Sequence, residues 1–433
     1  MKIGTLLSQV SLLFFGLTVT SISILQAQPA STETNTKEFV GSQACSSCHK
    51  EIHDRWKNTL MANVLQDPQE NPEVILGDFS TPNPLVNFKK EDIAFTYGSK
   101  WKQRYFTKIG EDYFVFGAQW NVRDKIWQRY YVSEGTDWWV SHYPKEQMKR
   151  PTGPTCDGCH STNYDYKTKS VTEWNVGCEK CHGPGSEHVR LGQQLKDLEQ
   201  AGGRKGAIVY LQNMTAATIV DPGRLDYVRA NDVCIQCHSQ GQPVANPVEG
   251  QYVDAPVGYL PGDQLSRYWN LEEHHLGEES FTHWPDGSAH KNRMQGNDYV
   301  TTMMYTRGVR CFSCHDVHGT AHSADIIKPG NSLCLQCHGP VSPLGPPGSL
   351  EEHTHHKANS EGSQCVACHM PAIAKTIGDV NVRSHTFRFV SPSMTEKYKI
   401  PNPCTSCHGD KTNQWALEEL QKWPQVSPWR MEQ

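Results

Sequence analysis

The sequence predicts a mainly α-helical fold with much irregular loop and one small antiparallel β insert. Helical periodicity is limited to short stretches, and strand-like alternation is limited to residues 90–132. Glycine and proline are frequent, with 34 and 26 residues, as is typical of loops. Hydrophobic residues make up only 37% of the 433-residue chain. This share excludes a polytopic membrane protein and leaves little apolar material for a conventional core of this length.

The most informative residues are the 16 cysteines and the 21 histidines. Every cysteine belongs to a C-x-x-C-H motif, which we call a clamp and number along the chain. The paired cysteines of the eight clamps are Cys45 and Cys48, Cys156 and Cys159, Cys178 and Cys181, Cys234 and Cys237, Cys311 and Cys314, Cys334 and Cys337, Cys365 and Cys368, and Cys404 and Cys407. The histidines that complete them are His49, His160, His182, His238, His315, His338, His369 and His408.

This motif matches the chemistry of c-type haem attachment. Two thiols separated by two residues can bond to the two vinyl groups of one haem, and the next imidazole then reaches the iron as the proximal ligand. A zinc site or a set of disulfides would explain the paired cysteines but not the histidine, which by chance follows a given cysteine about one time in twenty. The sequence therefore predicts eight covalently bound haem c groups, stacked so that they replace a conventional core.

The N-terminal residues predict export. Residues 1–27 combine a short basic start, a modest apolar run and the small residue Ala27, which together indicate a secretory signal peptide. An uncleaved membrane anchor is the alternative, although serine and threonine interrupt the run. We therefore expect a mature chain without a membrane span, located in the periplasm or outside the cell.

The uneven spacing of the clamps predicts the organisation of the rest of the chain. We expect a first haem segment at 38–89, a haem-free β-rich insert at 90–150, haems two to four at 151–240, a connecting segment at 241–300, haems five to eight at 301–410, and a C-terminal helix and tail at 411–433. The short linkers 161–177 and 316–333 predict that the second and third haems, and the fifth and sixth, are neighbours.

Three elements carry clear local signals. Alternating apolar residues predict an antiparallel sheet over 90–132, with a turn at Gly110. Ser186 is a candidate cap for a helix that ends near Gly202. A second helix is predicted from Thr412 to Trp423, with one apolar stripe of the kind that packs against a core.

The distal iron ligands separate an electron carrier from an enzyme, because an iron with two protein ligands passes electrons and an iron with an open face can bind a substrate. We expect distal ligands at His188, His318, His355 and His385, with His142, His290 and Met61 as further candidates. Solvated or hydrogen-bonding side chains are expected at His53, His274, His275, His322 and His353. No histidine follows the fourth clamp before His274, so the fourth haem is the first choice for an open site, and the first haem is the next.

Two runs, Trp174–His188 and Gly308–Gly319, resemble a family of multihaem cytochromes with a c-552/c-554-type domain and paired C-x-x-C-H motifs. This family is distantly similar to octahaem proteins such as hydroxylamine oxidoreductase. The resemblance implies that His188 and His318 are distal ligands. Many relatives have a histidine where Met61 stands, and no C-x-x-C-K motif is present, so the lysine-ligated catalytic haem of nitrite-reducing relatives is missing.

Two functions agree with these features. The first is electron transfer through an array of mostly bis-histidine haems, with redox proteins such as quinol-linked or periplasmic cytochromes as partners. The alternative is an oxidoreductase that acts on a small nitrogen or sulfur compound at one open haem, with His283, Asp286 and His290 as candidate proton donors. The formal net charge of -5, to which haem propionates would add, argues against a nucleic acid partner.

Overall fold

The protein is described by a computed structural model that covers residues 37–130, 151–246, 253–273, 276–278, 280–339, 341–343, 345–346 and 348–423. The predicted signal peptide at 1–27 and the candidate ligand His142 lie outside these residues. Among the residues within them, no helix is both long and apolar enough to cross a bilayer.

Most helices in this part of the chain are short, as the sequence predicts. In chain order they are α1 (Ser42–Cys45), α2 (Lys50–Trp56), α4 (Gly158–His160), α5 (Cys178–His182), α6 (Ser186–Gln200), α7 (Lys205–Ala217), α8 (Tyr227–Ile235), α9 (Gln295–Tyr299), α10 (Met303–Thr306), α11 (Asn331–Cys334), α12 (Leu350–Thr354), α13 (Cys365–His369), α14 (Pro392–Tyr398), α15 (Pro403–Cys407) and α16 (Asn413–Gln421). Single turns of 3-10 helix are η1 (Pro72–Val74), η2 (Lys90–Asp92), η5 (Pro222–Arg224), η6 (Leu265–Arg267), η7 (Cys311–Ser313), η8 (Ser323–Asp325) and η9 (Glu361–Ser363), and η4 (Gly153–Asp157) is a π-helical turn.

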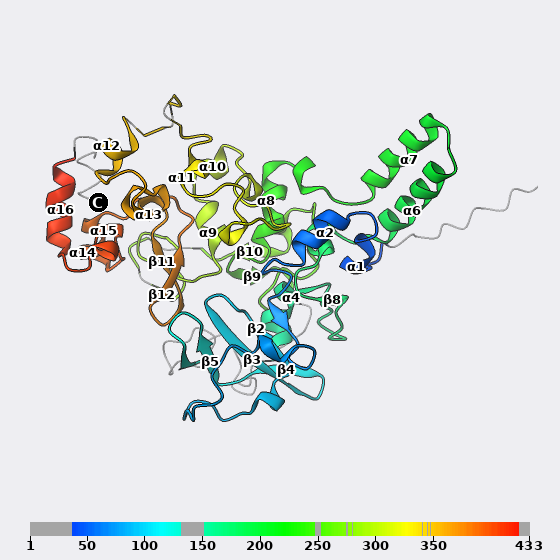
Figure 1. Ribbon diagram of the computed structural model, residues 1–433, viewed down its shortest axis with the longest axis horizontal. Helices are drawn as coiled ribbons and strands as arrows, with labels where there is room; N and C mark the ends of the chain where they lie inside the picture. The colour runs from blue at the N-terminus through cyan, green and yellow to red at the C-terminus, as the bar shows by residue number, and fades with distance from the viewer. Residues whose placement is uncertain are drawn as a thin grey trace, which may run out of the picture. The chain divides into compact units, whose positions relative to one another are not determined.

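The predicted antiparallel sheet is confirmed, and it gains one strand from upstream. Its strands are β1 (Leu65–Gln66), β2 (Phe95–Tyr97), β3 (Lys102–Ile109), β4 (Asp112–Val115), β5 (Ala118–Asn121) and β6 (Ile126–Arg129). They pair in the order β1-β2-β3-β5-β6, with β4 also on β3 (Figure 1). The β3–β4 turn falls at Gly110, whose φ of 64° is a left-handed conformation that glycine adopts without steric cost.

Apolar side chains cover both faces of this sheet. On one face Tyr105, Ala118, Trp120 and Trp127 form a buried cluster with residues from the segment between β1 and β2, such as Phe88. On the other face Phe106 packs in a second cluster that includes Tyr97 and Trp174. Because Trp174 lies just before the third clamp, this second cluster joins the sheet to the clamp region.

Helices α6 and α7 form an antiparallel hairpin (Figure 1). Leu191 is the buried residue of α6. The predicted cap is one residue out of place: Gly185 holds the cap position, and Ser186 is the first helical residue. The reason is a competing contact, since the Ser186 hydroxyl accepts a hydrogen bond from the backbone N–H of Glu38 at 2.9 Å. Sequence analysis missed α7 altogether.

The remaining elements are small. Two-stranded antiparallel hairpins are formed by β7 (Ser161–Thr162) with β8 (Glu173–Trp174), β9 (Gly241–Pro243) with β10 (Trp269–Leu271), and β11 (Ala372–Ile377) with β12 (Val380–Arg383). Helix α16 confirms the predicted C-terminal helix: the Thr412 hydroxyl caps it, and Ala416 and Leu420 are buried. Buried apolar residues occur in four separate clusters in the described part of the chain.

Candidate haem sites

Several clamps form a single helical turn. The histidine N–H donates to the carbonyl of the first cysteine at 2.9 Å in the first clamp, 3.0 Å in the fourth and 2.8 Å in the eighth. In such a turn, residues i and i+3 share one face, so both thiols project to the same side. The histidine then follows directly, which is the arrangement that two thioether bonds and one iron ligand require.

The clamp histidines are oriented for metal binding. His182 Nδ1 donates to the carbonyl of Val220 at 2.8 Å, and His315 Nδ1 donates to the carbonyl of Ala324 at 2.8 Å. A hydrogen bond from one ring nitrogen fixes the tautomer and leaves the other nitrogen, Nε2, as the metal ligand. The backbone carbonyls of Val220 and Ala324 therefore orient these two rings.

Four clamp histidines face a second imidazole ring. The ring centroids are separated by 6.2 Å in the pair His49–His188, 6.1 Å in His182–His318, 6.2 Å in His353–His369 and 6.1 Å in His356–His408. The first three pairs are nearly parallel, with interplanar angles of 14°, 16° and 6°, and the fourth is tilted by 33°. An iron bound to both rings through bonds of about 2.0 Å would separate the centroids by roughly 6.3 Å. The four pairs therefore fit haem iron held by two histidines.

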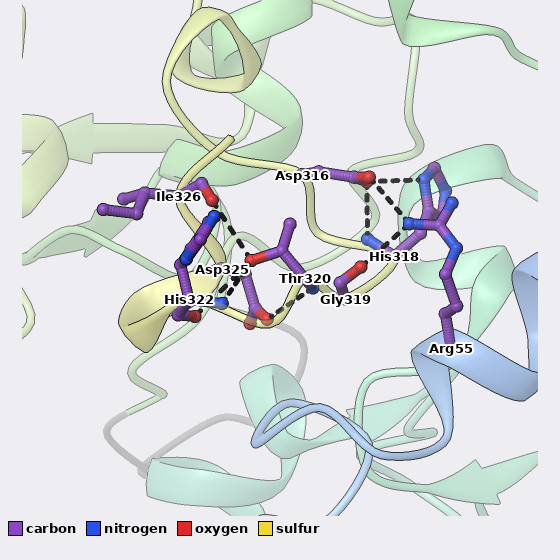
Figure 2. A network of polar contacts seen from close by, with 8 residues as sticks. All are labelled: Arg55, Asp316, His318, Gly319, Thr320, His322, Asp325 and Ile326. Atoms are coloured by element: carbon purple, nitrogen blue, oxygen red, sulfur yellow. Dashed lines mark hydrogen bonds and ion pairs between the residues drawn. The ribbon is translucent and has the colours of Figure 1, made fainter. Parts of the chain in front are cut away.

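The two distal candidates implied by the resemblance are both in these pairs and are held by further contacts. His188 lies on α6, and its Nδ1 donates to the carbonyl of Thr215 on α7 at 3.0 Å, so the helical hairpin orients the ring. His318 Nδ1 lies 3.2 Å from Asp316 Oδ1. Arg55 on α2 then bonds both Asp316 Oδ2 at 2.9 Å and the carbonyl of Gly319 at 2.8 Å (Figure 2).

In the C-terminal region the structure brings different histidines to the clamps than we expected. His353 and His356 face the seventh and eighth clamps, whereas His355 stacks on Trp423 with 4.3 Å between ring centroids. The reason is local: α12 ends at Thr354, and His355 adopts φ 52° as its C-cap, which turns its side chain away from its neighbours. The capping box of Ser349 and Glu352 is a sequence signal that would have placed this helix.

His385 lies near two clamp histidines without stacking on either. Burial, together with the nearby His315 and His238, lowers the pKa of His385 to about 4. Its Nδ1 donates to the carbonyl of Arg383 at 3.2 Å, which leaves Nε2 available. The structure therefore brings this predicted ligand to the region of the fourth and fifth clamps.

The second clamp differs from the four paired ones, because its histidine faces a phenol. His160 Nε2 is hydrogen-bonded to the hydroxyl of Tyr97 on β2, and the two ring centroids are 4.7 Å apart. Burial raises the pKa of Tyr97 well above its usual range, and the positive charge of Arg104 opposes that shift. The Tyr97 hydroxyl thus occupies the position next to His160 Nε2 that an iron would take in the paired sites. Tyr97 is a site residue that sequence analysis missed, since a tyrosine in an alternating strand carries no signal of its own.

The other candidates lie away from these pairs or in local turns. His188, and not Met61, faces the first clamp; Met61 accepts a backbone hydrogen bond from Val176. Asp286 accepts from the N–H and hydroxyl of Ser288, so it forms a turn. The other two candidate proton donors, His283 and His290, are buried. The His290 ring contacts that of Trp284 in a tilted arrangement with 4.0 Å between centroids, and His283 Nδ1 lies 3.2 Å from the hydroxyl of Thr282.

Contacts between thiols show which clamps are neighbours. The hydrogen-bonded thiol pairs are Cys45 with Cys178, Cys159 with Cys237, Cys234 with Cys311, and Cys334 with Cys365. These contacts join the first clamp to the third, the second to the fourth, the fourth to the fifth, and the sixth to the seventh. None of the sixteen cysteines forms a disulfide. Linker length predicted that the second clamp neighbours the third and the fifth neighbours the sixth. Lys180 Nζ donates to the carbonyl of Gly158 at 2.5 Å between the third clamp and the second, and Cys314 of the fifth lies near Cys337 of the sixth.

Two family models and one known protein match parts of this chain. Residues 304–342 match the family model described as a doubled CXXCH motif, and residues 125–183 match that of cytochrome c554 and c-prime. A probable tetraheme cytochrome c-type from Nitrosomonas europaea is 26% identical over 147 residues, which cover 34% of this chain and 58% of that protein.

Two solved structures are similar in fold. The outer cell wall cytochrome OcwA has a TM-score of 0.67 and 23% identity, over 89% of this chain and 86% of that chain. An undecaheme cytochrome from the S-layer of Carboxydothermus ferrireducens has a TM-score of 0.47 and 16% identity, over 89% and 60% of the two chains. The motifs, the family matches and the OcwA fold together show a multihaem c-type cytochrome with haem attached covalently at C-x-x-C-H motifs.

Proposed function

We propose that this protein is an exported octahaem cytochrome c that transfers electrons through an array of mostly bis-histidine haems. The observation that carries the proposal is the set of four facing imidazole pairs, because two strong axial ligands suit an iron to electron transfer and block substrate binding. His188, His318, His353 and His356 are the proposed distal ligands of the first, third, seventh and eighth haems. His385 is proposed for the fourth or fifth haem.

Clamp-to-clamp contacts support a continuous path for electrons. The first clamp contacts the third, and Gln236 Nε2 of the fourth donates to the carbonyl of Lys180 in the third at 3.1 Å. The fourth contacts the fifth, and Cys314 of the fifth lies near Cys337 of the sixth. The sixth contacts the seventh, and Cys368 of the seventh lies near the cysteines of the eighth. The second clamp contacts the fourth, so the second haem would form a side branch of this path.

Bound haem supplies one-electron redox chemistry at its iron. The residues of the chain hold and orient it: thiols anchor the macrocycle, and carbonyls such as those of Val220 and Thr215 fix the imidazole tautomers. Redox proteins in the periplasm or at the cell surface are the proposed partners. A cell-surface location is also stated in the name of the outer cell wall cytochrome that shares the fold.

Haem counting and redox cycling test this proposal. Produced with haem attachment, the processed chain should exceed its polypeptide mass by eight haems, and its ferric spectrum should be dominated by low-spin iron. The paired change Cys404→Ala and Cys407→Ala should remove one haem and leave the other seven. A smaller haem count, or haems that a redox partner protein cannot reoxidise after chemical reduction, would contradict the proposal.

One observation favours a second candidate function, the chemistry of a small ligand at the second haem. His160 Nε2 is hydrogen-bonded to the Tyr97 hydroxyl. If the Tyr97 ring moves aside when haem binds, the iron of the second haem has His160 as its one strong protein ligand. The positive charges of Arg293 and Arg104 lie near both His160 and Tyr97. An oxidoreductase for a small nitrogen or sulfur compound, the alternative function, would act at this second haem. The second haem therefore replaces the fourth and the first as our choice of open site.

Carbon monoxide binding checks this second candidate. We expect the second haem of the reduced protein to form an adduct, and Tyr97→His to lower the total adduct by about one haem in eight, because it supplies a distal imidazole there. Tyr97→Phe should keep the adduct. The matched control is Tyr113→His on β4, whose ring packs on Trp174 and Phe95. A wild-type protein that forms no adduct would leave electron transfer as the only function proposed here.

A further inference from the structure

Three of the clamp pairs are joined by the same backbone contact. The residue three positions before the first cysteine of one clamp accepts a hydrogen bond from the backbone N–H of the first cysteine of its partner. The acceptor is Ser42 Oγ for Cys178, Asn231 Oδ1 for Cys311 and Asn331 Oδ1 for Cys365, and each distance is 2.8 Å. The same three pairs have hydrogen-bonded first thiols.

The two asparagines repeat a second contact as well. Asn231 Nδ2 donates to the carbonyl of Val309 at 3.2 Å, and Asn331 Nδ2 donates to the carbonyl of Ser363 at 2.8 Å. Both carbonyls lie two residues before the partner's first cysteine, so each amide group spans the same short backbone segment. Ser42 uses its hydroxyl donor differently, on the carboxylate of Glu173 at 2.6 Å. The acceptor function is therefore the element common to all three.

We propose that Ser42, Asn231 and Asn331 are positioning residues that fix haems in three equivalent couples: first with third, fourth with fifth, and sixth with seventh. This inference rests on the proposed attachment of eight haems and goes beyond it, because it states how they are grouped. A haem is bonded directly to both cysteines of its clamp. A hydrogen bond to the backbone N–H of the first cysteine therefore fixes the position of the attachment point relative to the partner clamp.

The grouping excludes the second and eighth clamps. The second contacts the fourth through second cysteines instead, with Cys237 Sγ 3.9 Å from the carbonyl of Cys159. In the eighth clamp, Asn402 Oδ1 caps its own helix by accepting from Thr405 N–H at 3.0 Å. These two haems are therefore single members of the array, while the other six act as couples.

Asn331 offers the sharpest test, because it is only partly buried, whereas Asn231 and Ser42 are fully buried. In the fully loaded protein, Asn331→Ala should keep all eight haems by mass. It should lose about one third of the exciton-coupled circular dichroism in the Soret band, since one of three equivalent couples is disturbed. Asn331→Ser, which keeps an acceptor as Ser42 does, should restore the signal. Asn331→Asp, which keeps the acceptor but loses the bond to Ser363, should also retain most of it.

Gln336→Ala is the matched control. Gln336 lies within the sixth clamp, is exposed, and donates only to the carbonyl of Leu333 in the same turn at 3.1 Å. It should leave the Soret signal unchanged. An unaltered signal in Asn331→Ala, or equal losses in the alanine, serine and aspartate variants, would overturn the assignment. Because haem mass is measured on every variant, a failure of attachment, which would count against the proposed function, is seen separately from a failure of coupling.

Discussion

Produced without haem attachment, the chain should keep ordered structure in its β-sheet and lose it around the clamps. The sheet has its own core, in which Tyr105, Ala118, Trp120 and Trp127 are buried beside Phe88, and full burial of a large apolar side chain stabilises by roughly 1.5–3 kcal/mol. Among the clamp helices in the described residues, only α8 joins a buried apolar cluster, through Ile235, and many of the others are four or five residues long. Helices of that length are not stable alone in water.

Hydrogen exchange followed by mass spectrometry measures this difference. Without haem, amides of β2 to β6 should remain protected, and those of the fourth to eighth clamps should exchange within the shortest time measured. The haem-loaded protein is the control and should protect both regions. Protection of α11 and α13 in the haem-free chain would contradict the idea that macrocycles form most of the core.

Replacing His356 with alanine should change the spin state of one haem, while the same change at the adjacent His355 should not. His356 faces His408 with 6.1 Å between ring centroids, whereas His355 stacks on Trp423. Loss of a distal imidazole leaves an open axial position, so the eighth iron should become high-spin and bind carbon monoxide when reduced. Carbon monoxide binding should increase by about one haem in eight over the adduct that the wild-type protein already forms.

Electron paramagnetic resonance of the ferric protein, together with carbon monoxide difference spectra, measures both variants. His355→Ala is a control of matched size and position, and it should cost only the contact with Trp423. Its spectra should equal those of the wild type, with all haems present by mass. If His355→Ala rather than His356→Ala produced the high-spin signal, the assignment drawn from ring geometry would be wrong, and our expectation from sequence would replace it.

The sequence predicted the haem-attaching residues of the clamps better than the histidines that face them. A C-x-x-C-H motif is local, so its residues and role can be read from five positions. The facing histidines are not local, because His188 and His318 reach clamps other than the ones they follow. Their selection depended on a family resemblance. His353 was missed because which member of the run His353–His356 turns inward depends on where α12 ends.

The same division holds for the fold. The sheet and α16 were predictable, since alternation and a threonine cap are local signals. Helix α7 was not, because glycine, β-branched valine and aromatic tyrosine have weak helix propensity, and packing against α6 determines its structure. The Tyr97 contact with His160 required the sheet to be folded against the second clamp, which no short stretch of sequence records.

The pairing of clamps that are distant along the chain also sets an order of assembly. The first clamp emerges from the ribosome early, but its neighbour at Cys178 and its facing ring at His188 come from beyond the whole β insert. Closing such a long loop is slow compared with forming a helical turn. A haem attached at Cys45 and Cys48 before the chain folds would therefore lack its facing ring until the third clamp and α6 are in place. The first site along the chain is thus expected not to be the first one completed.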